Sequence, residues 1–350
     1  MKKKLIGLVI GLFSLSIVSA SSATELKLAT FEPPKAFIAS KILAGWAKKV
    51  NQCSAGELNV KMYAGGVLGS PPKQYDIVTS GVADISWTVL GYIGGQFPLS
   101  SVIELPFLTK SSKAGTTALN TLFNEGYLDK EMAGIKVIGL HSNPGYQIHM
   151  KEKKVVRPAD FKGMKMRVPS KIAGTILKTL GATGVKVPAP GTSEALSKGV
   201  VDGTPFPYTA VGSFRLFDVT KYHTEVNLTN ATFGLIMNED KFNSLPAGDQ
   251  ACINKFSGHA FGDWASSLID NQNAKMKTEI SKRDGHEIII ASDDVIAEYK
   301  QILAPIESDW LKEMSGKGLD GDAVLTRARE IITSIAVSYT HLRAHETCTN

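Results

Sequence analysis

Polar and apolar residues alternate, or recur at helical spacing, along the first part of the chain. Glu25–Ala29 and Leu58–Tyr63 alternate with a period of two, which predicts two strands. Between them, apolar residues fall on one face of a predicted helix over Ala36–Val50. A short helix over Lys73–Ser80 then leads to a third strand at Asp84–Val89. Strand, helix, strand, helix, strand is typical of an α/β layer.

The middle of the chain repeats this order. Its predicted elements are a pair of strands within Lys136–Met150, a strand at Lys165–Val168, a helix over Ile172–Leu180, a strand at Val185–Val187, a helix over Ser193–Lys198 and a short strand at Val200–Asp202. We therefore predict an α/β protein with two lobes of similar type.

The pattern changes at Pro246. Helical spacing continues from there to Gly285 with only isolated glycine interruptions, which is long for a helix of a globular protein. A helix of this length can bridge two lobes. The remaining predicted elements are a strand at Glu287–Ala291, a helix capped by Ser292 and running to Met314, and a closing helix over Asp322–Ala336.

The first residues have the pattern of a secretory signal peptide. A positive patch at Lys2–Lys4 precedes an apolar run, Leu5–Val18, and then the small residues Ser21–Ala23. We predict that residues 1–23 are cleaved near Ala23 and that the mature protein lies in the periplasm. The last fourteen residues, 337–350, follow no helix or strand period, and we interpret them as a non-native tail.

Composition and charge are those of an ordinary globular protein, with 350 residues, 43% hydrophobic and 21% charged. This length fits two lobes of roughly 100–150 residues each. The formal charge of +6 overstates the basic character. Without the three Lys of the signal and without Arg343 and Glu346 of the tail, the 39 basic and 33 acidic residues become 35 and 32. No basic block is interleaved with aromatic residues, so we expect no nucleic-acid partner.

The Cys, Ser and His residues form no motif of a metal or catalytic site. Cys53, Cys252 and Cys348 make no CxxC pair, which disfavours a structural zinc ion. An oxidising compartment allows a Cys53–Cys252 bond, but the sequence leaves the pairing open. HExxH, GxSxG and GxxxxGK[ST] do not occur, and the scattered histidines are expected to be packed or solvated. We predict no cofactor, no metal and no enzymatic activity.

Three segments together carry a family resemblance. They are FKGMKMRVP (Phe161–Pro169), LGATGVKVPAPGTSEALSKGVVDG (Leu180–Gly203), and the pairing of GGVLG (Gly65–Gly69) with FPLSSVIELPFL (Phe97–Leu108). In this order and spacing the chain resembles the DctP-type substrate-binding proteins of TRAP transporters (tripartite ATP-independent periplasmic systems), over nearly all of Glu25–Ala336. The resemblance implies a two-lobed clamshell with a long helix bridging both lobes. It also implies a small organic acid as ligand, and a small and a large membrane subunit as partners, powered by an ion gradient.

On this basis we predict the domain organisation, with the protein as a monomer. The predicted divisions are lobe I, 24–144 plus 234–272; lobe II, 145–233 plus 273–305; and C-terminal helices, 306–336.

The resemblance assigns Arg167, in the RVP motif, to the ligand carboxylate. An arginine presents a planar fork of donors that matches a carboxylate with two parallel hydrogen bonds. Arg167 lies on the predicted strand Lys165–Val168 next to Pro169, where it can be held rigidly at a strand end.

Four positions depart from the family pattern. Gln147 stands where relatives that bind sialic acids have a second Arg, and Phe206 replaces an Asn that meets the ligand. Two further polar contacts fall on Phe31 and Val89. Because one charge clamp remains while the rest becomes apolar or neutral, we predict an aromatic or hydrophobic monocarboxylate, with a 2-oxo acid whose keto oxygen meets Gln147 as one form.

Further aromatic residues are candidates for the walls of the site. They are Trp87, Tyr92, Tyr146, Tyr208 and Phe233. Three alternatives stay open at this point: a dicarboxylate or sugar acid as the ligand, a binding protein of an ABC-type importer, and, more distantly, a periplasmic enzyme.

Overall fold

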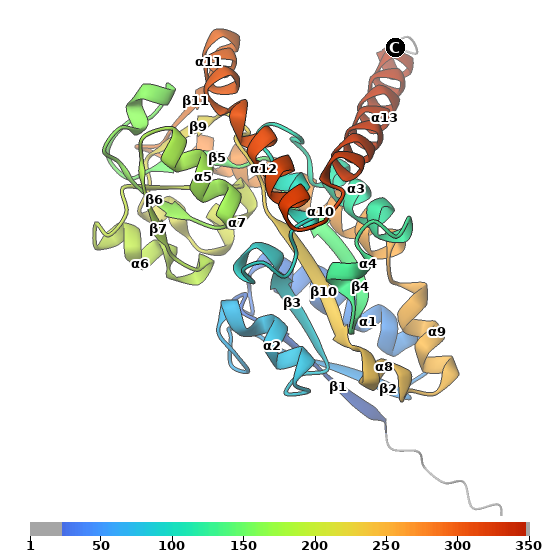
Figure 1. Cartoon of the computed structure of the whole chain (residues 1–350). Helices are drawn as coiled ribbons and strands as arrows, with labels where there is room; N and C mark the ends of the chain where they lie inside the picture. The colour runs from blue at the N-terminus through green and yellow to red at the C-terminus, as the bar shows by residue number, and fades with distance from the viewer. Residues whose placement is uncertain (1–22, 348–350) are drawn as a thin grey trace, which may run out of the picture.

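The computed structural model describes the backbone of residues 23–347 and the side chains of residues 23–335. Its strands form two separate sheets, one in each lobe (Figure 1). The sheet of lobe I has the order β2-β1-β3-β10-β4. Its strands are β1 (Thr24–Thr30), β2 (Leu58–Tyr63), β3 (Ile85–Val89), β4 (Ile135–Ser142) and β10 (Thr232–Asn238).

The centre of the lobe I sheet is buried on both faces. All five residues of β3 are buried, and so are the first six of β10. β1 runs parallel to β2 and β3, whereas β10 runs antiparallel to β3 and β4. Because β10 comes from far along the chain, lobe I is completed only after the chain has passed through lobe II.

The sheet of lobe II has the order β11-β9-β5-β8-β6-β7. Its strands are β5 (Gln147–Met150), β6 (Lys165–Val168), β7 (Thr183–Lys186), β8 (Gly203–Phe206), β9 (Tyr222–Glu225) and β11 (Glu287–Ile290). These sheets confirm the predicted two-lobed α/β clamshell. The predicted boundary between 233 and 234 cuts β10, which belongs entirely to the lobe I sheet. We therefore propose 24–144 with 232–272 as lobe I and 145–231 with 273–305 as lobe II.

Helices cover both sheets. Those packed on lobe I are α1 (Ala44–Cys53), α2 (Gln74–Thr79), α3 (Ser112–Asn124), α4 (Asp129–Met132) and α8 (Glu239–Asn243). Those of lobe II are α5 (Lys171–Thr179), α6 (Thr192–Ser197), α7 (Tyr208–Ser213) and α11 (Asp293–Leu303). α12 (Pro305–Gly316) lies between the lobes, and α13 (Gly321–Thr347) extends away from the body beside α3 (Figure 1).

The long helical segment predicted from Pro246 is present, and it bridges the lobes. It consists of α9 (Ala247–Lys255) and α10 (His259–Ser281), which meet at Gly258 with a φ of 58°. The Asp270 carboxylate on α10 accepts hydrogen bonds from backbone N–H groups at the start of α3, at 2.8 and 3.0 Å. One turn further, Asn273 Oδ1 accepts from the N–H of Thr209 in α7 of lobe II, at 3.1 Å.

Three predicted elements need correction. Val200–Asp202 is a turn, and the strand β8 begins only at Gly203, where the chain meets β5. The single helix predicted to run to Met314 is divided into α11 and α12 at Pro305, because proline has no N–H for the helical hydrogen bond. The closing helix does not end at Ala336, since α13 continues to Thr347.

Cys53, at the end of α1, forms a disulfide with Cys252 in α9, with the two Cα atoms 5.6 Å apart. The pairing that the sequence left open is therefore the one between these two residues, while Cys348 lies outside the described residues. Residues 1–22, which contain most of the predicted signal peptide, also lie outside them. Within residues 23–347, none of the helices combines the length and the apolar character needed to span a membrane.

Candidate ligand-binding site

A small cavity, with a volume of about 30 Å³, lies between the lobes. Both lobes contribute to its walls. The lining residues are Phe31, Glu32, Ile38, Trp87, Val89, Tyr92, Asn143, Tyr146, Arg167, Pro169, Ala189, Phe206, Thr209, Ala210, Ser213, Phe214, Ala231 and Phe233.

Lobe I supplies an aromatic wall built on its two central strands. Phe233 of β10 lies opposite Val89 of β3 in the antiparallel pairing. The Trp87 and Phe233 rings are stacked, with centroids 4.8 Å apart and planes at 11°. Phe31, just after β1, lies 5.1 Å from Trp87. These stacked rings give the cavity a flat, apolar surface that can cover another ring.

A buried histidine, His141, packs against this aromatic wall. The Trp87 indole N–H donates to His141 Nε2 at 2.8 Å, and the His141 ring stacks on Phe233 at 4.7 Å. Burial lowers the pKa of His141 to about 4, so the ring is neutral at pH 7 and can accept this bond. His141 is thus a packed residue, as the sequence predicted.

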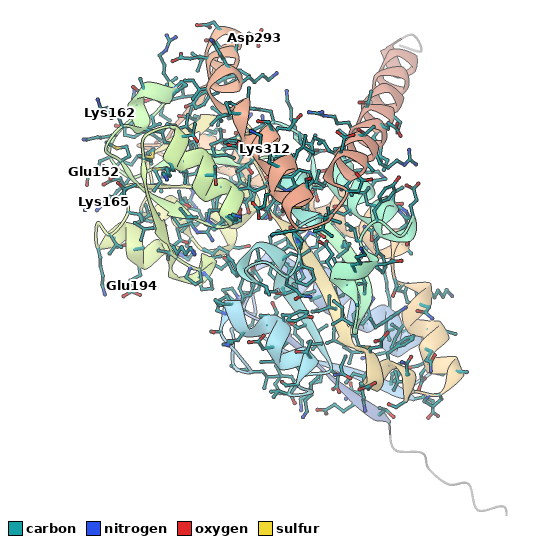
Figure 2. All side chains as sticks on the ribbon, viewed as in Figure 1. Glu152, Lys162, Lys165, Glu194, Asp293 and Lys312 are labelled. Carbon is teal, nitrogen blue, oxygen red and sulfur yellow. A yellow bond between two sulfur atoms is a disulfide. The ribbon has the colours of Figure 1, made fainter. Side chains whose placement is uncertain are left out.

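Arg167 extends from β6 of lobe II and is only 1% exposed. Its Nε donates to the carbonyl oxygen of Val187 at 2.8 Å, and its Nη2 donates to the Tyr92 hydroxyl at 2.9 Å. The Phe206 ring lies 4.3 Å from the guanidinium carbon, in cation–π contact. By contrast Lys165, at the start of the same strand, lies at the outer edge of the lobe with other charged residues (Figure 2).

The third nitrogen of this guanidinium has no partner. Arg167 Nη1 is buried and makes no hydrogen bond with any described residue. A buried donor on a charged group is costly to leave unsatisfied. The Val187, Tyr92 and Phe206 contacts fix the plane of the guanidinium and therefore the position of Nη1.

Tyr92 joins the lobes at the edge of the cavity. It lies on the 3-10 turn Leu90–Tyr92 that follows β3 in lobe I. Its hydroxyl accepts hydrogen bonds from two groups of lobe II, Arg167 Nη2 and the Ala189 N–H, both at 2.9 Å. Since the hydroxyl oxygen is used twice as an acceptor, its own hydrogen remains for a third group.

Eight of the ten predicted site residues line the cavity. They are Phe31, Trp87, Val89, Tyr92, Tyr146, Arg167, Phe206 and Phe233. They come from six separate stretches of the chain, and the fold brings them together around one space.

Gln147 and Tyr208 are not brought to the cavity. The Gln147 side chain binds the chain near Asn227: its Oε1 accepts from the N–H groups of Val226 and Asn227, and its Nε2 donates to Asn227 Oδ1. Only Nε2 could donate to a keto oxygen, and it already donates to Asn227 Oδ1 at 2.8 Å and to the carbonyl oxygen of Gly145 at 3.0 Å. Tyr208 donates to Glu225 Oε1 at 3.1 Å within lobe II. We therefore leave both residues out of the proposed site.

The structure adds polar residues that the sequence analysis missed. They are Glu32, Asn143, Thr209 and Ser213. Thr209 and Ser213 belong to α7, which begins at Tyr208, two residues after the predicted site residue Phe206, so continuing along the chain from Phe206 would have found them. Glu32 is adjacent to Phe31 in sequence.

Three histidines form a hydrogen-bonded chain in lobe II. His149 Nδ1 and His223 Nδ1 are 2.8 Å apart, and His223 Nε2 is 3.0 Å from His286 Nδ1. His149 Nε2 also lies 3.0 Å from the carbonyl oxygen of Phe206, whose ring faces the cavity. Burial lowers the pKa of His149 to about 4, so His149 is neutral at pH 7. The neutral histidine contacts the backbone of Phe206 and helps to hold it in position. Among the described residues, no group of three or more His, Cys, Asp or Glu side chains is arranged to hold a metal ion.

Comparison with known proteins gives a consistent result. The model of the family "bacterial extracellular solute-binding protein, family 7" matches residues 28–313. A TRAP solute-binding protein from Rhodoferax ferrireducens, crystallised with copurified benzoate, has a TM-score of 0.86 and 30% identity, over 91% of this chain and 100% of its own.

Two further similar proteins bind different acids. A TRAP solute-binding protein from a marine metagenome, specific for aromatic acid ligands and crystallised with 3-hydroxybenzoate, has a TM-score of 0.86 and 34% identity, over 90% of this chain and 99% of its own. The 2,3-diketo-L-gulonate-binding periplasmic protein of Escherichia coli is 25% identical over 71% of this chain and 76% of its own.

Proposed function

This chain belongs to family 7 of the bacterial extracellular solute-binding proteins, and from that premise we propose that it captures an aromatic or hydrophobic monocarboxylate and delivers it to the small and large membrane subunits of a TRAP transporter. Members of this family are receptors of transport systems and not enzymes, and two of the relatives are named periplasmic binding proteins. A cleaved signal peptide at residues 1–23 would account for export.

The unpaired Nη1 of Arg167 is the observation that carries the proposal. A buried, positioned donor on a cation calls for an anionic acceptor inside the cavity. A carboxylate oxygen on Nη1 would lie close to the free hydrogen of Tyr92, which could donate to the same carboxylate. The ligand acid group would then contact both lobes.

The charge balance of the cavity favours one carboxylate over two. Among the residues that the structure describes, Arg167 is the one cationic side chain lining this cavity, and Glu32 is acidic. A second carboxylate would stay buried without a partner, at a cost of several kcal/mol, on the order of 3–5. The stacked rings of Phe31, Trp87 and Phe233 would instead bury an aromatic body at about 25 cal/mol per Å².

The similar solved structures support the aromatic character of the ligand. Both were crystallised with benzoate or a hydroxybenzoate, and one is specific for aromatic acids. The form of the hypothesis that relied on Gln147, a 2-oxo acid, has no counterpart in this cavity, because Gln147 Nε2 already donates to Asn227 and Gly145. Benzoate-like acids are therefore the ligands we propose.

Thermal-shift screening against a panel of acids tests this proposal. Benzoate, hydroxybenzoates and mandelate should raise the melting temperature, while succinate and galacturonate should not. A ligand at 100 times its dissociation constant stabilises the folded protein by about 2.7 kcal/mol, which a melting curve resolves. A shift with succinate or the sugar acid, and none with the aromatic acids, would show that the proposed ligand class is wrong.

Replacement of Tyr92 by Phe should weaken binding of benzoate while leaving the fold intact. The variant keeps the ring but removes the oxygen that accepts from Arg167 and Ala189 across the lobes. Two donors of lobe II then lose their partner in the bound state, so we expect a loss of about 1–3 kcal/mol in binding free energy, measured by calorimetry. Tyr63→Phe is the matched control, since that hydroxyl lies outside the cavity and donates to Glu25 Oε1 at 3.2 Å. Equal affinities of wild type and Tyr92→Phe would contradict a role for the Tyr92 hydroxyl.

A further inference from the structure

Glu32 is a buried acid in a cavity proposed to bind an acid. It follows β1 in lobe I, is 3% exposed, and lines the cavity next to Phe31. Its Oε2 atom is buried and has no hydrogen-bond partner among the described residues. The position of this residue is well determined, because its N–H donates to Thr30 Oγ1 at 3.2 Å and its carbonyl accepts from Gly65 at 2.8 Å.

No cation neutralises this carboxyl group. Among the described residues, no charged group contributes to the pKa shift of Glu32, which has burial as its only cause. Burial raises the pKa of Glu32 to about 8, so the group carries a proton at neutral pH. A protonated carboxyl group can donate one hydrogen bond and accept others.

A purely structural role does not account for Glu32. Buried polar side chains of structural importance have partners, as Glu131 does: its carboxylate accepts from the N–H groups of Leu99 and Ser100. Glu32 has a similar degree of burial and no such donors at Oε2. A partner that enters the cavity with the ligand would satisfy it.

We propose that Glu32 is a specificity-determining residue, which selects aromatic acids that carry a hydroxyl group by hydrogen-bonding to that hydroxyl. The inference rests on the proposed function, since Arg167 of lobe II takes the carboxylate of the same ligand. Glu32 belongs to lobe I, so the hydroxyl and the carboxylate of the ligand would be bound by different lobes. The preferred ligand is therefore a hydroxylated aromatic monocarboxylate.

The chemistry of the cavity favours a hydroxyl over other polar groups. A hydroxyl donates one bond and accepts others, which matches a neutral carboxyl group. A second carboxylate would meet an acid with no cation beside it. An ammonium group would require Glu32 to ionise in a wall whose neighbours, Phe31 and Ile38, are apolar.

Calorimetry with matched ligand pairs tests the inference. Each of 2-, 3- and 4-hydroxybenzoate is compared with the methylbenzoate of the same position, and mandelate with 2-phenylpropanoate. For wild type, at least one hydroxyl ligand should bind about tenfold more tightly than its methyl partner, the size expected for one buried hydrogen bond. Glu32→Leu should abolish that preference, whereas Glu32→Gln, which keeps a donor and an acceptor, should retain most of it.

Two controls separate selection from stability. Glu57→Leu makes the same change at an exposed acid of lobe I and should leave the preference unchanged. Without ligand, Glu32→Leu should melt at or above the wild-type temperature, because it removes a buried group that has no partner; a structural carboxyl group would give the opposite result.

The failures of the two proposals are distinguishable. If the methyl acids bind and Glu32→Leu leaves the hydroxyl-to-methyl affinity ratio unchanged, Glu32 does not select the ligand, while the Arg167 proposal stands. If Glu32→Gln loses as much as Glu32→Leu and 3-(aminomethyl)benzoate binds best, Glu32 is an ionised partner of an ammonium group and our assignment is wrong. If no aromatic acid binds wild type, the proposed function fails, and this inference with it.

Discussion

Arg167→Ala is expected to abolish measurable binding of benzoate-like acids while the protein remains folded. The variant removes the fork whose Nη1 we propose as the carboxylate donor, and the ligand charge is then buried without a partner. Losing one member of such a pair costs about 2–5 kcal/mol, roughly 30- to 5,000-fold in affinity. Calorimetry with benzoate or 3-hydroxybenzoate measures this loss directly.

Two further variants sharpen the test. Arg167→Lys keeps the charge but lacks the planar fork that binds Val187 and Tyr92 together, so it should recover only a small part of the affinity. Arg157→Ala removes an exposed arginine of lobe II that pairs with Glu298, and it should bind like wild type. Undiminished binding by Arg167→Ala, with a normal melting curve, would remove Arg167 from the site.

Removal of the Cys53–Cys252 disulfide should be the largest stability change that leaves the site untouched. The bond joins α1 to α9 and closes a loop with a sequence separation of 199 residues. Losing a native disulfide costs about 2–5 kcal/mol of unfolding free energy. We therefore expect Cys53→Ala/Cys252→Ala, in a Cys348→Ala background that prevents thiol exchange, to unfold at a clearly lower denaturant concentration.

Reduction provides an independent check of the same quantity. Dithiothreitol should lower the stability of the Cys348→Ala protein and leave the triple variant unchanged. Because neither cysteine lines the cavity, benzoate affinity should be the same with and without the bond at temperatures where both proteins are folded. A triple variant as stable as its parent would show that the disulfide adds nothing to the folded state.

The part of the fold that follows local periodicity could be predicted from the sequence. β2 was predicted with its observed bounds, Leu58–Tyr63, because its residues alternate between a buried and a more exposed face. β10 gave no such signal, since its first six residues are all buried and therefore show no alternation. Its place between β3 and β4 depends on pairing with distant strands, which one sequence does not specify.

The residues of the site also fall into those that the sequence could predict and those that it could not. The position of Arg167 followed from a motif with characteristic neighbours, and the aromatic walls followed from departures within that motif pattern. Glu32 was missed because a glutamate in a loop is usually solvated, whereas the fold buries this one to 3% exposure. Gln147 was assigned to the ligand from its position in the family pattern. In the fold, its amide oxygen instead accepts from the backbone N–H groups of Val226 and Asn227.

The unpaired nitrogen of Arg167 has a consequence for how a transporter distinguishes cargo-loaded receptors from unloaded ones. When the receptor closes without a ligand, a cationic N–H group of Arg167 is buried away from water, with no acceptor beside it among the described residues. When a ligand carboxylate accepts from this N–H group, the same interaction favours the closed conformation over the open one. If Arg167 binds the ligand as we propose, closing without a ligand is disfavoured by the same atom that binds the ligand. The membrane subunits would then rarely meet a closed receptor that is empty.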